Sequence, residues 1–72
     1  MKQYAVVIER GEKGGYGAYI PDLPGCVAVA KTEAEVRTLI REAMLLHLRS
    51  MREDGDPIPE PSTQVDYVSL AS

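Results

Sequence analysis

Several residue types are scarce in this chain of 72 residues, and each scarcity excludes a class of protein. A single cysteine, Cys26, rules out an intrachain disulfide, and with only one histidine there is no Cys/His cluster to hold a metal ion. No apolar run approaches the roughly 18 residues that a membrane-spanning helix needs. The N-terminal residues lack the apolar stretch of a signal peptide, so we expect a cytoplasmic protein.

The chain is long enough for one domain, residues 1–72, and for a small core. Such a core supplies only roughly 3–5 kcal/mol, so self-association or a bound partner is the remaining way to bury more surface. The net charge of −3 argues against direct binding of DNA or RNA. After Arg52 every charged residue is acidic: Glu53, Asp54, Asp56, Glu60 and Asp66. This acidic end suits a basic protein partner, or it is an ordinary solvated surface.

Three segments rich in β-branched, aromatic and small residues predict strands, over residues 3–10, 16–20 and 26–30. The first connection is rich in glycine, and the second is Pro21-Asp22-Leu23-Pro24-Gly25, which interrupts pairing. Short connections between sequential strands predict an antiparallel meander.

A helix is predicted from about residue 33 to 53. Thr32 can cap its first turn, Glu35 completes a capping box, and Gly55 can end it in the left-handed conformation. A helical projection at 100° per residue places Leu45 opposite the apolar stripe and Leu48 at its edge. The predicted stripe consists of Val36, Leu39, Ile40, Ala43, Met44, Leu46, His47 and Met51.

The prolines of residues 57–61 favour an extended strap close to polyproline II, and residues 64–70 then predict a fourth strand. The resulting fold is α+β, with two layers in the order β-β-β-α-β. A right-handed crossover places the fourth strand beside the first, so the mixed sheet has the order 3-2-1-4. One helix covers one face. The other face stays apolar and exposed, which predicts a homo-oligomer.

Few residues suggest chemistry. Asp22 in its tight loop is expected to bond to nearby backbone amides, Cys26 to be a small buried residue, and His47 to lie in the core. Glu9, Asp22 and Glu42 are the candidates for a metal-dependent nuclease of the RNase H type, which needs several carboxylates converging on metal ions. The first strand, however, has Val-Val-Ile at its centre, where such an enzyme needs an acid.

Three segments together carry a family resemblance: residues 15–26, containing Pro-Asp-Leu-Pro-Gly-Cys, residues 32–35, and the strap with its Pro-x-Pro pattern. In order and spacing they resemble the HicB-family antitoxin domain. The resemblance implies a partial RNase H-like fold without enzymatic activity or cofactor, and a partner that is a HicA-type mRNA interferase toxin, typically a basic protein.

Many antitoxins of that family carry a DNA-binding segment after this domain, and this chain ends at Ser72. We therefore expect a stand-alone antitoxin that binds no DNA, forms a dimer or tetramer, and lacks metal and catalytic residues. The alternatives are a structural homo-oligomer with another protein partner, and the nuclease. The predicted partner-binding residues are Tyr16, Tyr19, Leu23, Leu45 and Leu48.

Overall fold

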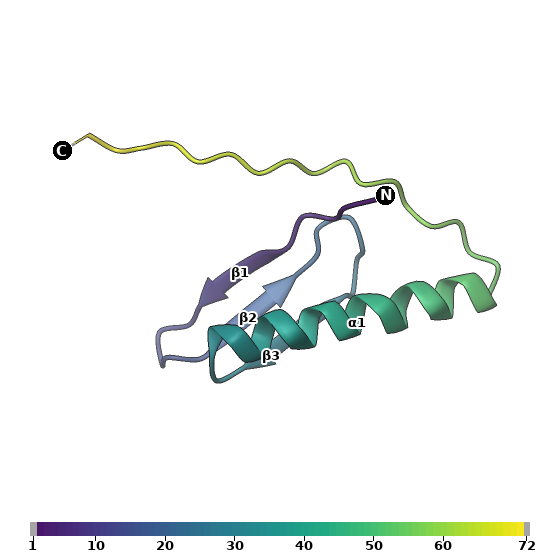
Figure 1. Ribbon diagram of the computed structural model, residues 1–72, viewed down its shortest axis with the longest axis horizontal. Coiled ribbons are helices and arrows are strands. Elements are labelled where there is room, and N and C mark those ends of the chain that lie inside the picture. The colour runs from purple at the N-terminus through teal and green to yellow at the C-terminus, as the bar shows by residue number, and fades with distance from the viewer. Residues whose placement is uncertain (1, 72) are drawn as a thin grey trace.

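The computed structural model describes residues 2–71, in which three strands and one helix form two layers (Figure 1). The strands are β1 (Val7–Arg10), β2 (Tyr16–Tyr19) and β3 (Val27–Ala30), and the helix is α1 (Glu33–Glu53). The predicted α+β class, the meander and the helix are therefore confirmed.

The sheet is antiparallel in the order β1-β2-β3, and its register decides which side chains face the helix. Ile8 lies opposite Ala18, which lies opposite Ala28 on its other side, and this row faces α1. The neighbouring row of Val7, Tyr19 and Val27 faces away because side chains alternate along a strand.

The connection between β2 and β3 is a compact loop closed by its own backbone. The Cys26 carbonyl accepts a hydrogen bond from the Ile20 amide at 3.2 Å, and the Leu23 carbonyl accepts one from the Cys26 amide at 3.0 Å. Gly25 adopts a φ of 88°, a left-handed conformation that a residue with a Cβ rarely takes. Leu23 is 0% exposed, so this loop inserts its side chain into the core.

Both ends of α1 follow the predicted signals. The Glu35 amide donates to Thr32 Oγ1 at 3.1 Å, which is the N-cap bond of a capping box. Glu35 Oε1 accepts from the Thr32 hydroxyl at 3.0 Å, whereas a full capping box has it accept from the Thr32 amide. At the other end Gly55 has a φ of 74°, and the amide of Asp56 donates to the Met51 carbonyl at 2.9 Å, as in a Schellman motif.

The helix packs on β3 and β2, and its buried side agrees with the predicted stripe at Val36, Ile40, Ala43 and Met44 but not throughout. Val36 and Ile40 are buried, and Met44 and Leu48 pack against the core, so contact recurs every four residues. Leu39 and Leu46 are instead exposed, at 41% and 63%, which corrects their predicted place in the stripe. A helix of 21 residues is roughly 30 Å long, whereas strands of four residues span about 13 Å. Part of α1 therefore overhangs the sheet (Figure 1).

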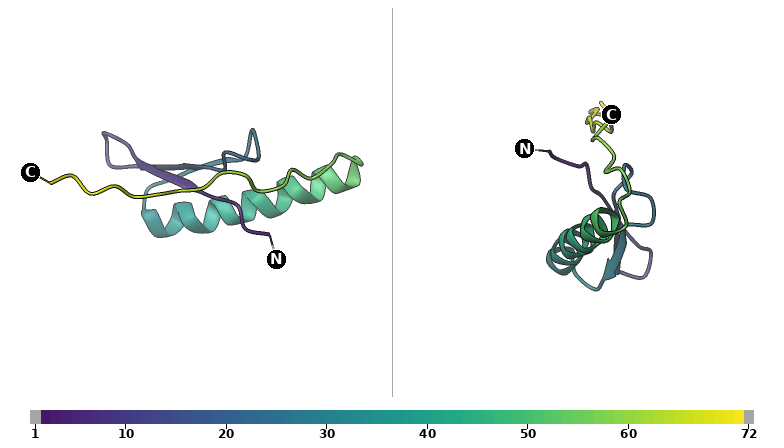
Figure 2. Two further views of the ribbon diagram at one scale, coloured as in Figure 1. Left: turned by 90° about the horizontal axis from the view of Figure 1, so that it is seen from above. Right: turned by 90° about the vertical axis from the view of Figure 1, so that its right-hand side faces the viewer.

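The predicted fourth strand is the main difference between the expectation and the structure. Among residues 2–71 the sheet has three strands, so the predicted order 3-2-1-4 is not observed and β1 lies at an edge. Residues 64–71 are extended and exposed, and they pass beyond β1 in its own general direction without pairing with it (Figures 1 and 2). The predicted pairing of residues 64–70 with the first strand is therefore not observed.

Candidate protein-binding surfaces

Residues 57–63, here called the strap, lead from α1 back across the body of the protein, and their end is fixed by one carboxylate. Asp22 accepts four hydrogen bonds from two consecutive residues. Oδ2 accepts the backbone amides of Ser62 and Thr63 at 2.9 and 3.0 Å, and Oδ1 accepts their hydroxyls at 3.0 and 2.7 Å. Asp22 was expected to bond to nearby backbone amides of its own loop, but the amides that it accepts belong to residues 40 and 41 positions away.

These bonds favour the ionised carboxylate. The amide and hydroxyl of Thr63, followed by the amide of Ser62, lower the pKa of Asp22 from 3.8 to about 2. The carboxylate is therefore ionised at neutral pH, and its acceptor sites are occupied by the strap. Asp22 holds the strap in place.

Two further contacts hold the strap beside the N-terminal residues. Tyr4 Oη donates to the carbonyl of Pro59 at 2.5 Å, and Lys2 Nζ lies 2.9 Å from Glu60 Oε1. The hydrogen bond to Glu60 raises the pKa of Lys2. Because both partners of that ion pair are exposed, it contributes little to stability.

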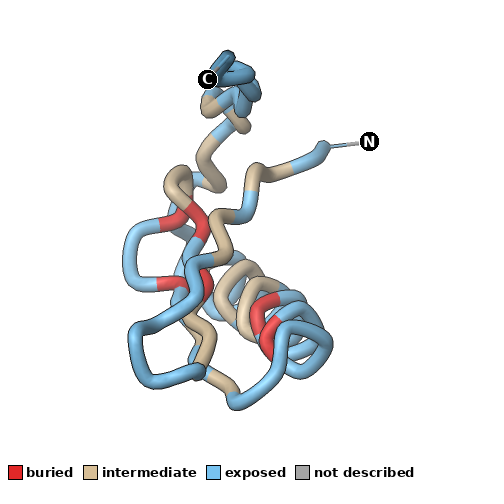
Figure 3. Tube along the Cα trace, turned by 90° about the vertical axis from the view of Figure 1, so that its left-hand side faces the viewer, coloured by how far each residue is buried: buried red, intermediate tan, exposed pale blue. Residues whose placement is uncertain are grey.

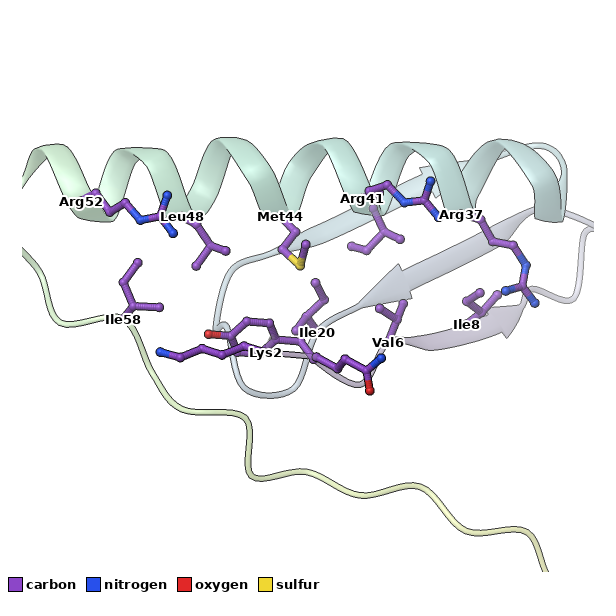
Figure 4. A pocket seen from close by; sticks show the side chains of 13 residues that line it. Lys2, Val6, Ile8, Ile20, Arg37, Arg41, Met44, Leu48, Arg52 and Ile58 are labelled. Carbon is purple, nitrogen blue, oxygen red and sulfur yellow. The ribbon is translucent and has the colours of Figure 1, made fainter.

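A groove of about 1100 Å³ lies between α1, the N-terminal residues and the strap (Figure 4). We call it the edge groove, because β1 and the residues before it form one side. Its apolar lining is made up of Tyr4, Val6, Ile8, Ile20, Ile40, Met44, Leu48 and Ile58. Its basic residues are Lys2, Arg37, Arg41 and Arg52. The groove therefore offers an apolar channel with a cationic border.

Residues 64–71, here called the tail, behave differently from the strap. In the strap Ile58, Pro59, Pro61 and Thr63 are half-buried, whereas every residue of the tail is exposed (Figure 3). Tyr67, Val68 and Leu70 are 90%, 92% and 89% exposed. A second hollow of about 470 Å³ separates the tail from β1, and Tyr67 lines it together with Val6, Ile8 and Arg10.

The outer face of the sheet, turned away from α1, is the second apolar surface. Tyr19, Val27 and Val29 are exposed there, as expected for a face that no helix covers in residues 2–71. Tyr4, Ile8 and Tyr16 pack on the helix side instead. An exposed apolar face is therefore present, and within the strands it consists of Tyr19, Val27 and Val29.

The five predicted partner-binding residues do not share one surface. Tyr19 lies on the outer face of the sheet, while Leu45 is exposed on α1. Tyr16 and Leu48 are half-buried against the core. Leu23 is fully buried, so its side chain supports the loop from beneath and presents nothing to a partner. The sequence placed these residues by element but could not tell which side of each element faces outward.

The structure does not assemble the candidate chemical residues. Within residues 2–71 no group of three His, Cys, Asp or Glu side chains converges as a metal site would require, so Glu9, Asp22 and Glu42 remain apart. Cys26 is buried as expected, and burial raises the pKa of its thiol. His47 is half-buried on α1. No helix in the described part of the chain is both long enough and apolar enough to cross a membrane.

Sequence comparison finds relatives over nearly the whole chain. The family described as "HicB_like antitoxin of bacterial toxin-antitoxin system" matches residues 4–71. "UPF0150 protein Ta0767" of Thermoplasma acidophilum is 32% identical over 62 residues, which are 86% of this chain and 90% of that protein. A "UPF0150 protein" of Archaeoglobus fulgidus is 39% identical over 75% of this chain and 81% of its own length. "Antitoxin HicB 1" of Photorhabdus laumondii is 30% identical over 94% of this chain and 44% of its own length.

Proposed function

Because this chain belongs to the HicB-like antitoxin family, we propose that it is a protein-binding module that neutralises a HicA-type mRNA interferase toxin. The observation that carries this proposal is the family match over residues 4–71, which spans the strands, the helix and the strap. An antitoxin has to meet its toxin where mRNA is cleaved, so we also propose that the protein acts in the cytoplasm.

The family supports binding rather than catalysis, since its members are described as antitoxins. The position of Asp22 agrees with this role. A nuclease carboxylate has to be free to hold a metal ion, whereas that of Asp22 already accepts four hydrogen bonds from Ser62 and Thr63. The nuclease is therefore not retained as a candidate function.

The outer face of the sheet is the surface that we propose for the toxin. Tyr19, Val27 and Val29 form an exposed apolar patch on the sheet, and aromatic and aliphatic side chains of this kind anchor protein interfaces.

The charge pattern of the chain after Arg52 suits a basic partner. All five acidic residues that follow Arg52 are exposed: Glu53, Asp54, Asp56, Glu60 and Asp66.

Reconstitution with a purified HicA-type toxin tests this function. We expect RNA cleavage to stop when the chain and the toxin are present in equal amounts. Val29→Glu places a charge on the outer face and should abolish inhibition, whereas the matched variant Val29→Thr, of similar shape, should retain most of it. Cleavage that continues unchanged in an excess of the wild-type chain contradicts the proposal.

A structural homo-oligomer with another protein partner is the second candidate, because the tail exposes apolar residues. We propose self-association as a property of the chain in either case. The two functions are separated by the toxin assay: a chain that associates with itself and leaves RNA cleavage unaffected has the structural role. The single-domain organisation over residues 1–72 and the partial RNase H-like arrangement remain predictions.

A further inference from the structure

The tail has the chemistry of a strand but no strand to pair with. Apolar side chains occur on both of its alternating faces, with Val65 and Tyr67 on one and Val68 and Leu70 on the other. A strand that is apolar on both faces is typical of the interior of a sheet. In the described chain, however, all of these side chains are exposed and residues 64–71 take no part in the sheet.

The edge of β1 that faces away from β2 also has no strand beside it in the described chain. Within residues 2–71, β1 pairs only with β2, so its other side presents backbone amides and carbonyls without a neighbouring strand. Beside that edge lie the edge groove and the smaller hollow that Tyr67 borders. Both are spaces that the side chains and backbone of one added strand would fill.

The strap fixes the point from which the tail starts. Asp22 holds Ser62 and Thr63 beside the loop that connects β2 and β3, and Tyr4 holds Pro59. The tail therefore starts from a fixed point and passes beyond β1 with a hollow between them (Figures 1 and 2).

We propose that two copies of this chain exchange their tails, so that the tail of each copy pairs with the β1 edge of the other. A two-fold axis perpendicular to the tails makes the two tails antiparallel to each other. Since each tail runs in the direction of its own β1, the incoming tail is antiparallel to the β1 that it joins. Two three-stranded sheets and two tails then form one continuous antiparallel sheet.

Charge favours the tail as the occupant. Of the four basic residues that border the edge groove, Lys2 already pairs with Glu60 and Arg37 with Glu33. Arg41 and Arg52 are the cations offered to Asp66, the charged residue of the tail. The exchange also covers the Val, Tyr and Leu side chains that a single copy leaves in water. This inference rests on the proposed self-association and is independent of toxin binding.

The first experiment measures oligomeric state and amide exchange of the full chain. We expect a dimer by light scattering, with amides 65–70 protected and their protection lost on dilution. Val68→Pro removes a backbone donor from the tail and should give a monomer, whereas the matched control Val68→Thr keeps the donor and should dimerise. Val68 is 92% exposed, so amide protection within β2, β3 and α1 should be unchanged in both variants, whereas the outward-facing amides of β1 should lose protection in Val68→Pro alone.

The outcomes separate the two proposals. A wild-type chain that is monomeric contradicts both self-association and tail exchange. A dimer that survives Val68→Pro, or whose tail amides exchange freely, contradicts tail exchange alone and points to another surface, such as the outer face of the sheet.

A spin label identifies the chain that supplies the tail. Ser69→Cys is labelled in an unenriched chain and mixed with a ¹⁵N-enriched wild-type chain; Cys26, buried in the core, should stay unlabelled. We expect the enriched β1 amides to broaden, more at Val7 than at Arg10. The control is a chain that carries both the spin label and the ¹⁵N enrichment. If the β1 amides broaden only in that sample, the tail folds on the β1 edge of its own chain and the proposal is overturned. Stronger broadening at Arg10 overturns the antiparallel arrangement.

Discussion

The strap and the tail are consecutive parts of one extended segment, yet the protein treats them oppositely. The strap is rich in proline, which lacks an amide donor, and three of its residues bond to Asp22 or Tyr4: Pro59, Ser62 and Thr63. The tail contains no proline and carries more β-branched and aromatic side chains, yet it is exposed throughout. Between the strap and the tail, the segment with more strand-forming side chains is therefore the more exposed one. The tail has the residues of a strand, but the described part of a single chain offers it no neighbouring strand.

The same substitution made in the body and in the tail should give the largest contrast. Leu23→Ala empties a fully buried position beneath the loop that carries Asp22, and should lower the free energy of unfolding by about 2–5 kcal/mol. Leu70→Ala in the tail should change it by less than about 0.5 kcal/mol in the monomer. Urea unfolding of dilute samples measures both. A similar loss in the two variants would mean that the tail packs within one copy.

Asp22→Ala should release the strap without unfolding the core. The amides of Ser62 and Thr63 both donate to Asp22, so we expect them to lose most of their protection from hydrogen exchange. Asp22→Asn keeps an oxygen acceptor and should give an intermediate result. Asp56→Ala, a nearby exposed acid, is the matched control and should leave both amides protected. If Asp22→Ala leaves them equally protected, the carboxylate does not hold the strap.

Acid should release the strap in a defined range. The pKa of Asp22 is about 2 in the folded chain and 3.8 ordinarily, so its contribution to stability is complete above pH 3.8. That contribution decreases as the pH falls and is absent below about pH 2. NMR titration of the Ser62 and Thr63 amides should show this low midpoint, and Asp22→Asn should abolish the transition. A midpoint near 3.8 would mean that the four hydrogen bonds do not favour the ionised form.

Tyr4→Phe should have the smallest effect. It removes the hydrogen bond to the Pro59 carbonyl and should cost about 0.5–1.5 kcal/mol, as expected for one hydrogen bond. Tyr67→Phe makes the same change in the tail, where the side chain is 90% exposed, and should be neutral in dilute samples. If the two variants change the thermal unfolding of the protein equally, the strap is no more firmly held than the tail.

The parts of the fold that the sequence predicted correctly depend on local signals. Thr32 with Glu35 fixed the start of α1, and Gly55 fixed its end, because capping is decided within a few residues. The turn glycines likewise marked the limits of the strands, although each strand is shorter than predicted.

The parts that were not predicted depend on contacts between distant residues. Nothing near Asp22 indicates Ser62 and Thr63, which lie 40 and 41 residues away. The orientation of α1 was misjudged because Leu46 and Leu48 are both apolar, and only packing against the sheet selects Leu48. Residues 64–70 were predicted to pair because their pattern fits a strand. A pattern indicates the need for a neighbour but not which chain supplies it.

The burial of Cys26 has a consequence for oxidative chemistry. Sulfenic acid formation and glutathione adducts both require an accessible thiolate, and this sulfur is enclosed in the core and remains protonated at neutral pH. Since Cys26 is the only cysteine of the sequence, peroxide should leave the chain chemically intact at sulfur apart from its methionines. Any response of this chain to oxidants therefore has to originate in its methionines and not in its cysteine.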